Sequence, residues 1–569
     1  MLFERIKMSK KNVDVINLIL KESKAYTSLE VIENFIQEKK SLESLPVQPL
    51  YTTFKNLPVE IKSHAMSLLS KEQREVFYDL DLWKKDTLDI PSFSEMVKTI
   101  SKSPDENLRY EFSRSSEFAL FIKGRFNTWT FDVEDPLYPD HDYYFLTEDN
   151  LLLFEYDEDC EIVDEVKQLI KDIYSELGVE KAYQYIFTVV SDGFISLSEN
   201  EYEKKKERLK HFGFVDYIEA LQITNSFPSL GHVDLFISKK EMISAEIDEL
   251  ERNQTLHANS LIAFEENELN ISNELAKIED SKRYDYLHFN FIRLVNANLE
   301  KNDAIKDGAM TMTRIGKIVR NHLELGFSYI KANRDFTDDE SIFDYFDFVD
   351  VYRVGSSLLT LVQKSVKKEL AAFELDTVDD NFLGQYFEDF LDGLFASDIK
   401  VSTLGELHSV VHVDQFKRLR DQSELLIQFL PFAMTFKKNL MSLISEGQIN
   451  DDFYLNYSSE SIDIEAILMS LIINFSLGKL NAQTPKMGVT IAELKTFHHK
   501  FFKNQSLIVE SIDGLLEDFI SNFGLREVNH LKPYIVGVMM AQMNDYEVDR
   551  LEDHEFKHIG GPILLNNLS

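Results

Sequence analysis

The sequence contains one complete match to a catalytic motif, the pentapeptide His554-Glu555-Phe556-Lys557-His558. On an α-helix, histidines four residues apart share one face and can hold Zn²⁺, while the glutamate between them deprotonates a metal-bound water. The motif therefore predicts a metal-dependent hydrolase in which His554 and His558 bind zinc and Glu555 is the general base. A third ligand has to come from upstream, and the candidates are His498, His530 and Glu552. A pentapeptide of this kind also arises by chance, so coincidence is the alternative interpretation.

A second pair of histidines, His408 and His412, has the same spacing, and we expect both on a helix. The residues between them are Ser409, Val410 and Val411, none of which can act as a general base. We therefore interpret the pair as packing or surface residues rather than as metal ligands.

The most unusual stretch of the chain is the window 126–166, which holds 14 acidic residues and neither lysine nor arginine. Carboxylates at this density repel one another, so solvent, a divalent cation or a basic surface has to offset them. The window is therefore a solvated face, a docking surface for a basic partner or another part of the chain, or a Ca²⁺ or Mg²⁺ site. As a partner-binding surface it would use Asp140, Asp142, Asp157, Asp159 and Glu161.

A basic stripe is predicted on a helix further along the chain. Arg314, Lys317 and Arg320 follow one another at intervals of three, which places them along one helical face. Such a stripe can clamp a phosphate or a carboxylate, and the protein would then be a sensor of an anionic small molecule. The alternative is that these side chains are solvated or pair with the protein's own carboxylates.

Composition limits the class of protein. The chain has 569 residues, with 61 Lys plus Arg against 98 Asp plus Glu, and so a formal net charge of −37. We therefore expect no binding to nucleic acid, whose phosphates such a charge repels. Glycine (20) and proline (12) are scarce and aromatic residues make up 12% of the chain, which favours helices over turn-rich β-folds or disorder. The single cysteine, Cys160, rules out an internal disulfide and cysteine-based zinc sites.

No targeting or membrane segment is evident. The first residues, MLFERIKMSKK, are charged, and Asp14 and Asn17 interrupt the apolar stretch that follows them, so we expect no secretory signal. The most apolar segments, such as 464–477, are shorter than the roughly 20 residues that a membrane helix needs. The sequence thus predicts a cytoplasmic protein without a membrane span.

Helices are expected to dominate. Ser or Thr is followed three residues later by Glu or Gln at Thr27, Ser70, Ser198, Thr337 and Thr490, the capping-box pattern of helix starts. Residues 57–83 are predicted to form an αα-hairpin. One β-hairpin is expected, over 143–146 and 151–154, around the turn residues TEDN. After residue 239 we expect helices without strands, over 241–330, 340–373, 381–396, 415–447, 462–478, 491–523 and 531–555.

Three stretches read LPVEIKSHAMSLLSKEQREVFYDLDLWKKD, LYPDHDYYFLTEDNLLLFEYDED and EYEKKKERLKHFGFVDYIEAL. This order of an L-x-x-L unit, a D-x-x-x-L-T hairpin and a basic helix resembles an uncharacterised bacterial family of unknown function. The resemblance covers about residues 50–220. It implies a mostly helical cytoplasmic protein and brings no catalytic residues with it.

The sequence therefore predicts a mostly α protein in three regions. These are a helical-hairpin array (1–132), an acidic α+β region with a β-hairpin (133–238) and a large helical C-terminal region (239–569). Because no complete catalytic set is evident, we expect a non-enzymatic interaction or scaffold protein that needs no cofactor and binds a protein partner with a basic surface. The alternatives are the zinc-dependent hydrolase and the anion sensor.

Overall fold

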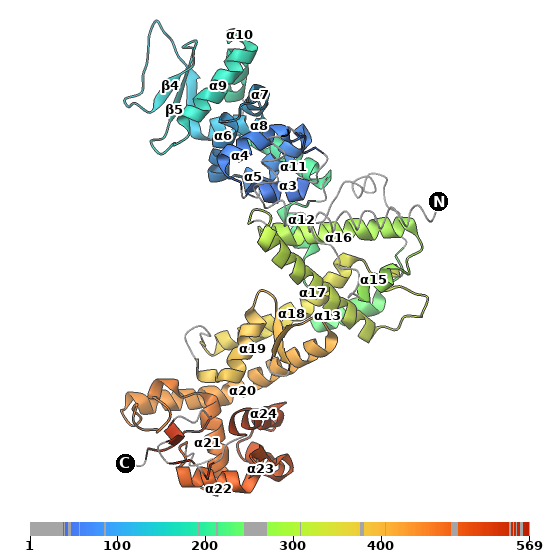
Figure 1. Cartoon of the computed structure of the whole chain (residues 1–569), viewed down its shortest axis with the longest axis vertical. Helices are drawn as coiled ribbons and strands as arrows, with labels where there is room; N and C mark the ends of the chain where they lie inside the picture. Colours follow the sequence, from blue (N-terminus) through green and yellow to red (C-terminus); the bar gives the residue numbers. More distant parts are fainter. Residues whose placement is uncertain are drawn as a thin grey trace. The chain divides into compact units, whose positions relative to one another are not determined.

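The structure is a computed structural model of the chain (Figure 1). It describes residues 38, 40–43, 47–55, 57–84, 87–191, 194–211, 214–243, 270–307, 309–375, 381–403, 406–479, 487–544, 548–549, 551–552, 555–557 and 562–567. The chain divides into two compact units. Unit 1 comprises Met1–Asn225, Lys239–Leu323 and Asp335–Arg353, and unit 2 comprises Ser226–Ser238, Glu324–Arg334 and Val354–Ser569.

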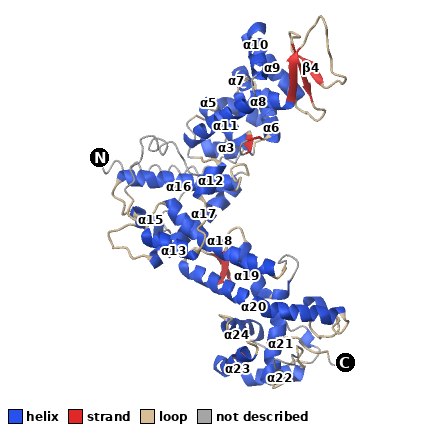
Figure 2. Ribbon diagram, turned by 180° about the vertical axis from the view of Figure 1, so that it is seen from behind, coloured by secondary structure: helices blue, strands red, loops and turns tan. Residues whose placement is uncertain are grey.

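The fold is mostly helical with a few small antiparallel sheets, as predicted (Figure 2). Unit 1 begins with the elements α3 (Val47–Lys55), α4 (Val59–Ala65), η1 (Met66–Leu68), α5 (Lys71–Asp81), β1 (Trp83–Lys84), β2 (Thr87–Leu88), α6 (Ile90–Ser101), α7 (Glu106–Ser113) and α8 (Ser116–Arg125). It continues with β3 (Phe126–Thr130), β4 (Tyr144–Leu146), β5 (Leu152–Tyr156), α9 (Val163–Leu177), α10 (Val179–Ser191), α11 (Phe194–His211), α12 (Tyr217–Ile223), α15 (Asn270–Leu275), α16 (Ser281–Lys301) and η2 (Ile342–Asp344).

The two helices predicted over 57–83 are present as α4 and α5. They do not pack as the predicted αα-hairpin, because α4 contacts chiefly α6, and α5 contacts α3 and α11. Pro58 precedes the first turn of α4, where a missing N–H costs no hydrogen bond. Ser70 accepts a hydrogen bond from the backbone N–H of Gln73, whose side chain accepts one from Ser70 in return, so the predicted capping box is present. Aromatic rings fill the core of this part of the unit; for example, Phe93 and Phe121 stack with ring centroids 4.3 Å apart.

Unit 2 is built mainly from helices, of which α20 (Val413–Ser445) is the longest described. Its elements are α13 (Leu230–Lys239), η3 (Asn381–Leu383), α19 (Gln385–Phe395), β6 (Lys400–Thr403), β7 (Glu406–Ser409), α20 (Val413–Ser445), η4 (Ser459–Ser461), α21 (Ile464–Ser476), α22 (Ile491–Phe501), β8 (Phe502–Lys503), β9 (Ser506–Leu507), α23 (Val509–Asn522), α24 (Leu531–Met543) and η5 (Glu555–Lys557). Two further helices, α17 (Ala309–Asn333) and α18 (Phe348–Ala372), contribute residues to both units. At the centre of unit 2, every residue of α21 from Ile464 to Asn474 is buried.

The expectation that no strand follows residue 239 was wrong. Strands β6 and β7 pair around residues 404–405, and β8 and β9 form a hairpin inside the stretch predicted as one helix over 491–523. Asn504 and Gln505 adopt positive φ of 49° and 64° there, a left-handed turn that ends the first helix. Strands of two to four residues are too short to give a detectable period of two.

Three local expectations also fail or lie outside the described residues. Ser198 lies inside α11, which begins at Phe194, and Thr337 closes a turn with Glu340 instead of starting a helix. A capping-box pattern predicts a helix start only where the preceding residue leaves the helix, and in α11 it does not. Thr27 lies outside the described residues.

No helix among the residues that the structure describes combines the length and the apolarity needed to cross a membrane. The interleaved units differ from the three predicted regions, and independent folding of those regions stays a prediction.

Candidate functional site

The acidic window contains a three-stranded antiparallel sheet in the order β3-β5-β4. The predicted hairpin is confirmed, because β4 pairs with β5 in a register that places Phe145 opposite Phe154. Strand β3, which pairs with β5 on its other side, was not predicted. Thr147 fixes the turn: its hydroxyl donates to Asp149 at 2.6 Å and accepts from the backbone N–H of Leu152 at 3.1 Å.

One face of this sheet is packed against helices. Phe145 and Phe154 stack with ring centroids 5.0 Å apart, and the ammonium of Lys167 on α9 lies 5.3 Å from the Phe145 ring. Phe126 extends this aromatic layer toward Phe121 of α8, with centroids 6.2 Å apart. The sheet is therefore anchored to the helical body, and its loops have a fixed support.

The loop 131–143, between β3 and β4, is exposed over almost its whole length. Phe131 is its only buried residue. Three apolar side chains project to solvent, those of Val133, Leu137 (76% exposed) and Tyr138. Five carboxylates share the loop: Asp132, Glu134, Asp135, Asp140 and Asp142. We call these eight exposed side chains the acidic loop surface.

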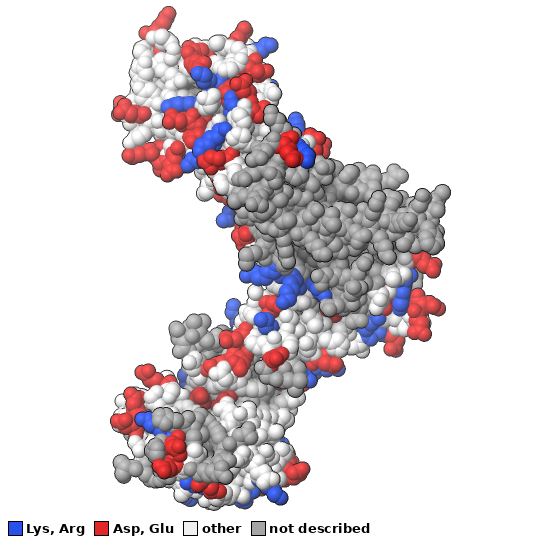
Figure 3. All heavy atoms as spheres, in the orientation of Figure 1, with Lys and Arg blue, Asp and Glu red and all other residues white. Residues whose placement is uncertain are grey.

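Tyr138 gives the loop a defined contact with the sheet. Its ring lies 5.1 Å from that of Phe131 and 5.8 Å from that of Tyr144 on β4, measured between centroids. His141 Nε2 lies 2.9 Å from a carboxylate oxygen of Glu155 on β5. In Figure 2 the tan loops extend beyond the red strands of this sheet, and in Figure 3 carboxylate atoms lie at the margin of a largely uncharged surface over it.

The second half of the predicted partner-binding set has partners within unit 1. Arg125, the residue before β3, lies 3.7 Å from Asp157 and 3.1 Å from Asp159. Lys98 of α6 lies 3.3 Å from Glu161. These three carboxylates remain largely exposed, so the ion pairs are weak. The structure therefore brings basic groups from outside the window to one part of it and leaves Asp140 and Asp142 on the exposed loop.

The predicted basic stripe lies on α17, as expected. Arg314 and Lys317 are exposed and Arg320 is partly buried. An anion held by this stripe stays a prediction.

Of the HEFKH motif, the structure describes only the three central residues, 555–557. Glu555 to Lys557 form the 3₁₀ helix η5, in which Phe556 is buried, whereas His554 and His558 lie outside the described residues. A 3₁₀ helix is not the α-helix that the motif needs for two histidines on one face. Of the upstream candidates, His498 is buried and stacks on Phe502 at 4.3 Å.

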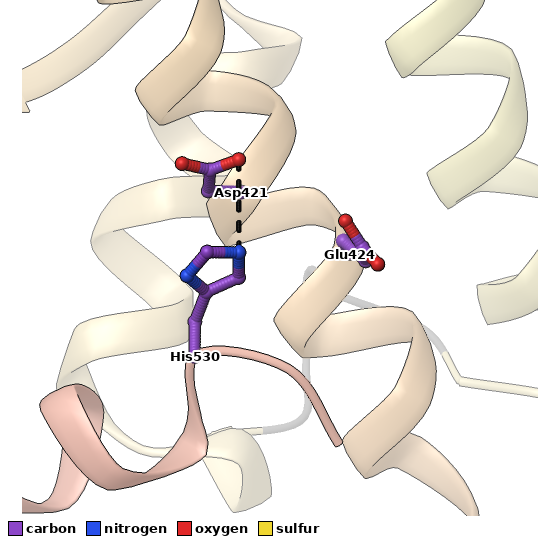
Figure 4. A group of neighbouring side chains, drawn as sticks. All are labelled: Asp421, Glu424 and His530. Carbon is purple, nitrogen blue, oxygen red and sulfur yellow. Dashed lines mark ion pairs between the residues drawn. The ribbon is translucent and has the colours of Figure 1, made fainter. Parts of the chain in front are cut away.

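His530, another candidate third ligand, lies beside two carboxylates of α20 (Figure 4). Ligand atoms of Asp421, Glu424 and His530 all lie within 4.8 Å of one another, a mixed oxygen and nitrogen set that suits a divalent metal. However, one oxygen of Glu424 already accepts hydrogen bonds from the side-chain amides of Asn529 at 2.6 Å and Gln428 at 3.2 Å. These amides fix the position of Glu424 alone, while Nε2 of His530 lies 3.7 Å from a carboxylate oxygen of Asp421.

The second histidine pair is not on one helix. His408 lies on strand β7 opposite Val401, and His412 is the N-cap residue of α20. The side chain of His412 accepts a hydrogen bond from the backbone N–H of Asp414. Its role is therefore to end a loop and begin a helix.

Sequence reasoning missed a cavity of about 450 Å³ in unit 1. It lies beside α11, whose sequence contains the run Lys204-Lys205-Lys206. That run was the available signal, but on a helix with so many acidic neighbours it is also typical of a solvated face.

Comparison with known proteins adds a family and no activity. A family model, described as a family of unknown function, matches residues 8–558 of the chain. No curated protein and no solved structure matches the chain.

Proposed function

The chain belongs to this family of unknown function, DUF6178, and because that description carries no activity, we propose from the geometry that the protein is a cytoplasmic interaction protein. It binds a partner protein through the acidic loop surface. The observation that supports this is the combination, on one anchored loop, of exposed apolar side chains with carboxylates and neither lysine nor arginine.

The apolar side chains supply the attraction. Leu137 and Tyr138 are exposed to solvent. Burying them on binding is favourable by about 25 cal/mol for each Å² of apolar surface removed from water. Soluble proteins expose single apolar side chains routinely, whereas a group of them rimmed by polar residues is typical of an interface. The Tyr138 ring is held between Phe131 and Tyr144, so little conformational freedom is lost when a partner covers it.

The carboxylates define the partner's chemistry. A surface with five acidic side chains and no lysine or arginine attracts a partner whose contact region is apolar at its centre and carries lysine or arginine around it. Asp157, Asp159 and Glu161 lie closer to the protein's own Arg125 and Lys98 and therefore contribute less.

The test is affinity capture of the full chain from its own cells, followed by reconstitution with the purified partner. A partner recovered in stoichiometric amount should bind at least tenfold more weakly to Leu137→Ser, because burial of one leucine is worth about 1.5–3 kcal/mol. The double variant Asp140→Asn, Asp142→Asn should bind more weakly at low salt, and the difference should shrink at high salt.

The matched control is Leu235→Ser, which removes an exposed leucine from α13, far from this loop in the sequence. Binding that is equal in Leu137→Ser and Leu235→Ser removes the proposal. Native mass spectrometry of the same preparation tests the hydrolase alternative: one zinc per chain, lost in His554→Ala, would favour that activity instead.

A further inference from the structure

Three side chains that can bind a metal ion meet where helix α20 contacts the loop before α24 (Figure 4). Asp421 and Glu424 are three residues apart on α20, so both carboxylates lie on one face of that helix. His530 is the last residue of the loop between α23 and α24. One ligand atom of each side chain lies within 4.8 Å of the other two, and the part of the chain that the structure describes holds no second group of this kind.

The gap between His530 and Asp421 is too wide for a hydrogen bond. Nε2 of His530 lies 3.7 Å from Oδ1 of Asp421. In another pair of unit 2 that joins distant segments, by contrast, Nε2 of His499 lies only 2.8 Å from Oδ1 of Asp549. Two atoms that each bind one zinc ion at about 2.1 Å are about 3–4 Å apart. The distance between His530 and Asp421 is therefore the one expected for two ligands of a shared ion.

The two carboxylates have no basic partner that would take the place of a cation. Among the described residues, no lysine or arginine forms an ion pair with Asp421 or Glu424. The amides of Asn529 and Gln428 donate to the same oxygen of Glu424, which leaves its second oxygen without a described hydrogen bond. The side chains of Asp421 and His530 are 38% and 43% exposed, so an ion can reach them from solvent.

The loop that carries His530 is fixed to α20 by the residue before it. The side-chain amide of Asn529 donates to Glu424 at 2.6 Å, and its backbone N–H donates to the side-chain oxygen of Gln428, also at 2.6 Å. Hydrogen bonds of this kind orient the ligands in metal sites. His530 precedes α24 with φ of +61°, and its side chain makes no capping hydrogen bond to that helix. The imidazole is therefore not needed to begin α24.

We propose that Asp421, Glu424 and His530 bind one divalent transition-metal ion, and that zinc matches this set best. Calcium and magnesium take oxygen ligands, whereas an imidazole nitrogen favours zinc and its neighbours. Three protein ligands leave the fourth position of a tetrahedral zinc ion to water. The ion would join α20 to the start of α24. The site uses neither the acidic loop surface nor the HEFKH motif, so it is independent of the proposed partner binding and of the hydrolase alternative.

The test is isothermal titration calorimetry of the full chain with Zn²⁺, after treatment with EDTA and removal of the chelator. We expect one ion per chain. Asp421→Asn and His530→Ala should each weaken binding at least tenfold, because each removes one ligand of the ion. The matched control is Asp549→Asn, which removes a carboxylate that also lies beside a histidine but belongs to no group of three ligands, and it should bind as the wild type does. Zinc should also raise the midpoint of thermal unfolding of the wild type but not that of Asp421→Asn.

Weak binding in Asp421→Asn and His530→Ala, with unchanged binding in Asp549→Asn and in His554→Ala, supports the proposal. It is overturned if zinc does not bind, if Asp421→Asn binds as the wild type does, or if Asp549→Asn weakens binding equally. Loss of the ion in His554→Ala also overturns it, because the zinc would then belong to the HEFKH motif. If circular dichroism shows that His530→Ala is unfolded, Glu424→Gln takes its place, since it removes the remaining ligand and has to weaken binding too.

Discussion

The guanidinium of Arg208 donates two hydrogen bonds to the carboxylate of Asp79: Nε and Nη2 lie 2.8 and 2.6 Å from its two oxygens. The same guanidinium lies 3.4 Å from Glu117, so α11 is joined to α5 and to α8 by one side chain. Both carboxylates are buried, and burial raises the pKa of Asp79 to about 6 and that of Glu117 to about 7. The three-residue network is therefore a tertiary link of unit 1 that depends on one positive charge.

Replacing that charge should be strongly destabilising. Arg208→Met leaves two buried carboxylates without a partner, and we expect a loss of about 3–5 kcal/mol in the free energy of unfolding at pH 8, measured with urea. The loss should be smaller at pH 5, where both carboxylates are protonated and need no counter-charge. In the control, Arg125→Met, the partners Asp157 and Asp159 are exposed, so the loss should stay below about 1 kcal/mol. Equal losses in the two variants would contradict the role of burial.

Glu465 should make the stability of unit 2 depend on pH. It is buried on α21 and accepts hydrogen bonds from the Tyr386 N–H at 3.0 Å and the Tyr534 hydroxyl at 3.3 Å. Burial raises its pKa from 4.5 to about 7, so the folded state holds this proton more tightly than the unfolded state. Its contribution to stability is therefore full below pH 4.5 and is lost as the pH rises through 7.

The variant Glu465→Gln removes this dependence. Between pH 4.5 and pH 8 the free energy of unfolding should fall by about 3 kcal/mol more in the wild type than in the variant. This difference corresponds to the raised pKa of Glu465. Guanidinium unfolding at several pH values measures it. Glu460→Gln, an exposed residue of η4, is the control and should follow the wild type. A variant with the same pH profile as the wild type would show that Glu465 ionises normally in the folded state.

Gly384 should tolerate no side chain. It has φ of +82°, and a Cβ added to it would lie 2.5 Å from Cγ of Glu465. Gly384→Ala should therefore cost more than about 2 kcal/mol, as the sum of a left-handed backbone and a steric clash. Gly447→Ala isolates the backbone part, since Gly447 has φ of +72° and open space around it, and it should cost only about 1–2 kcal/mol. The difference between the two melting temperatures reports the clash.

The capping box at Ser70 predicts a smaller effect. Ser70→Ala removes the acceptor of the Gln73 N–H at the start of α5, and about 1 kcal/mol of stability should be lost. Ser67→Ala removes a hydroxyl that only donates to the carbonyl of His64, and it should be nearly neutral. Thermal unfolding of the two variants in parallel provides the comparison.

Local sequence signals predicted the elements whose causes are local. The turn at residues 147–150 and the capping boxes at Ser70 and Thr490 depend on side chains that bond to a backbone only a few residues away. Strand β3 was missed because its pairing with β5 brings Phe126 next to Tyr156, a contact that no local pattern encodes. The hairpin of β8 and β9 was missed because two-residue strands show no alternation.

The same limit applies to the sites. The sequence shows where carboxylates cluster, but it does not show that Leu137 points to water while Leu153 is fully buried. The cavity is assembled from residues as far apart as Trp83 and Lys306, and Arg125, just before β3, pairs with Asp157 and Asp159, just after β5. Charge composition predicts neither the cavity nor the ion pairs of Arg125, because both depend on how segments far apart in the sequence pack together.

Helix α21 has no solvent-facing side along the eleven residues from Ile464 to Asn474. An amide proton there can exchange with deuterium only when the surrounding helices separate, so these amides should be the slowest to exchange in unit 2. Their exchange rate therefore measures how often the whole unit opens. A protease, too, would reach this segment only during those openings, which makes α21 the last part of unit 2 to become a substrate for degradation.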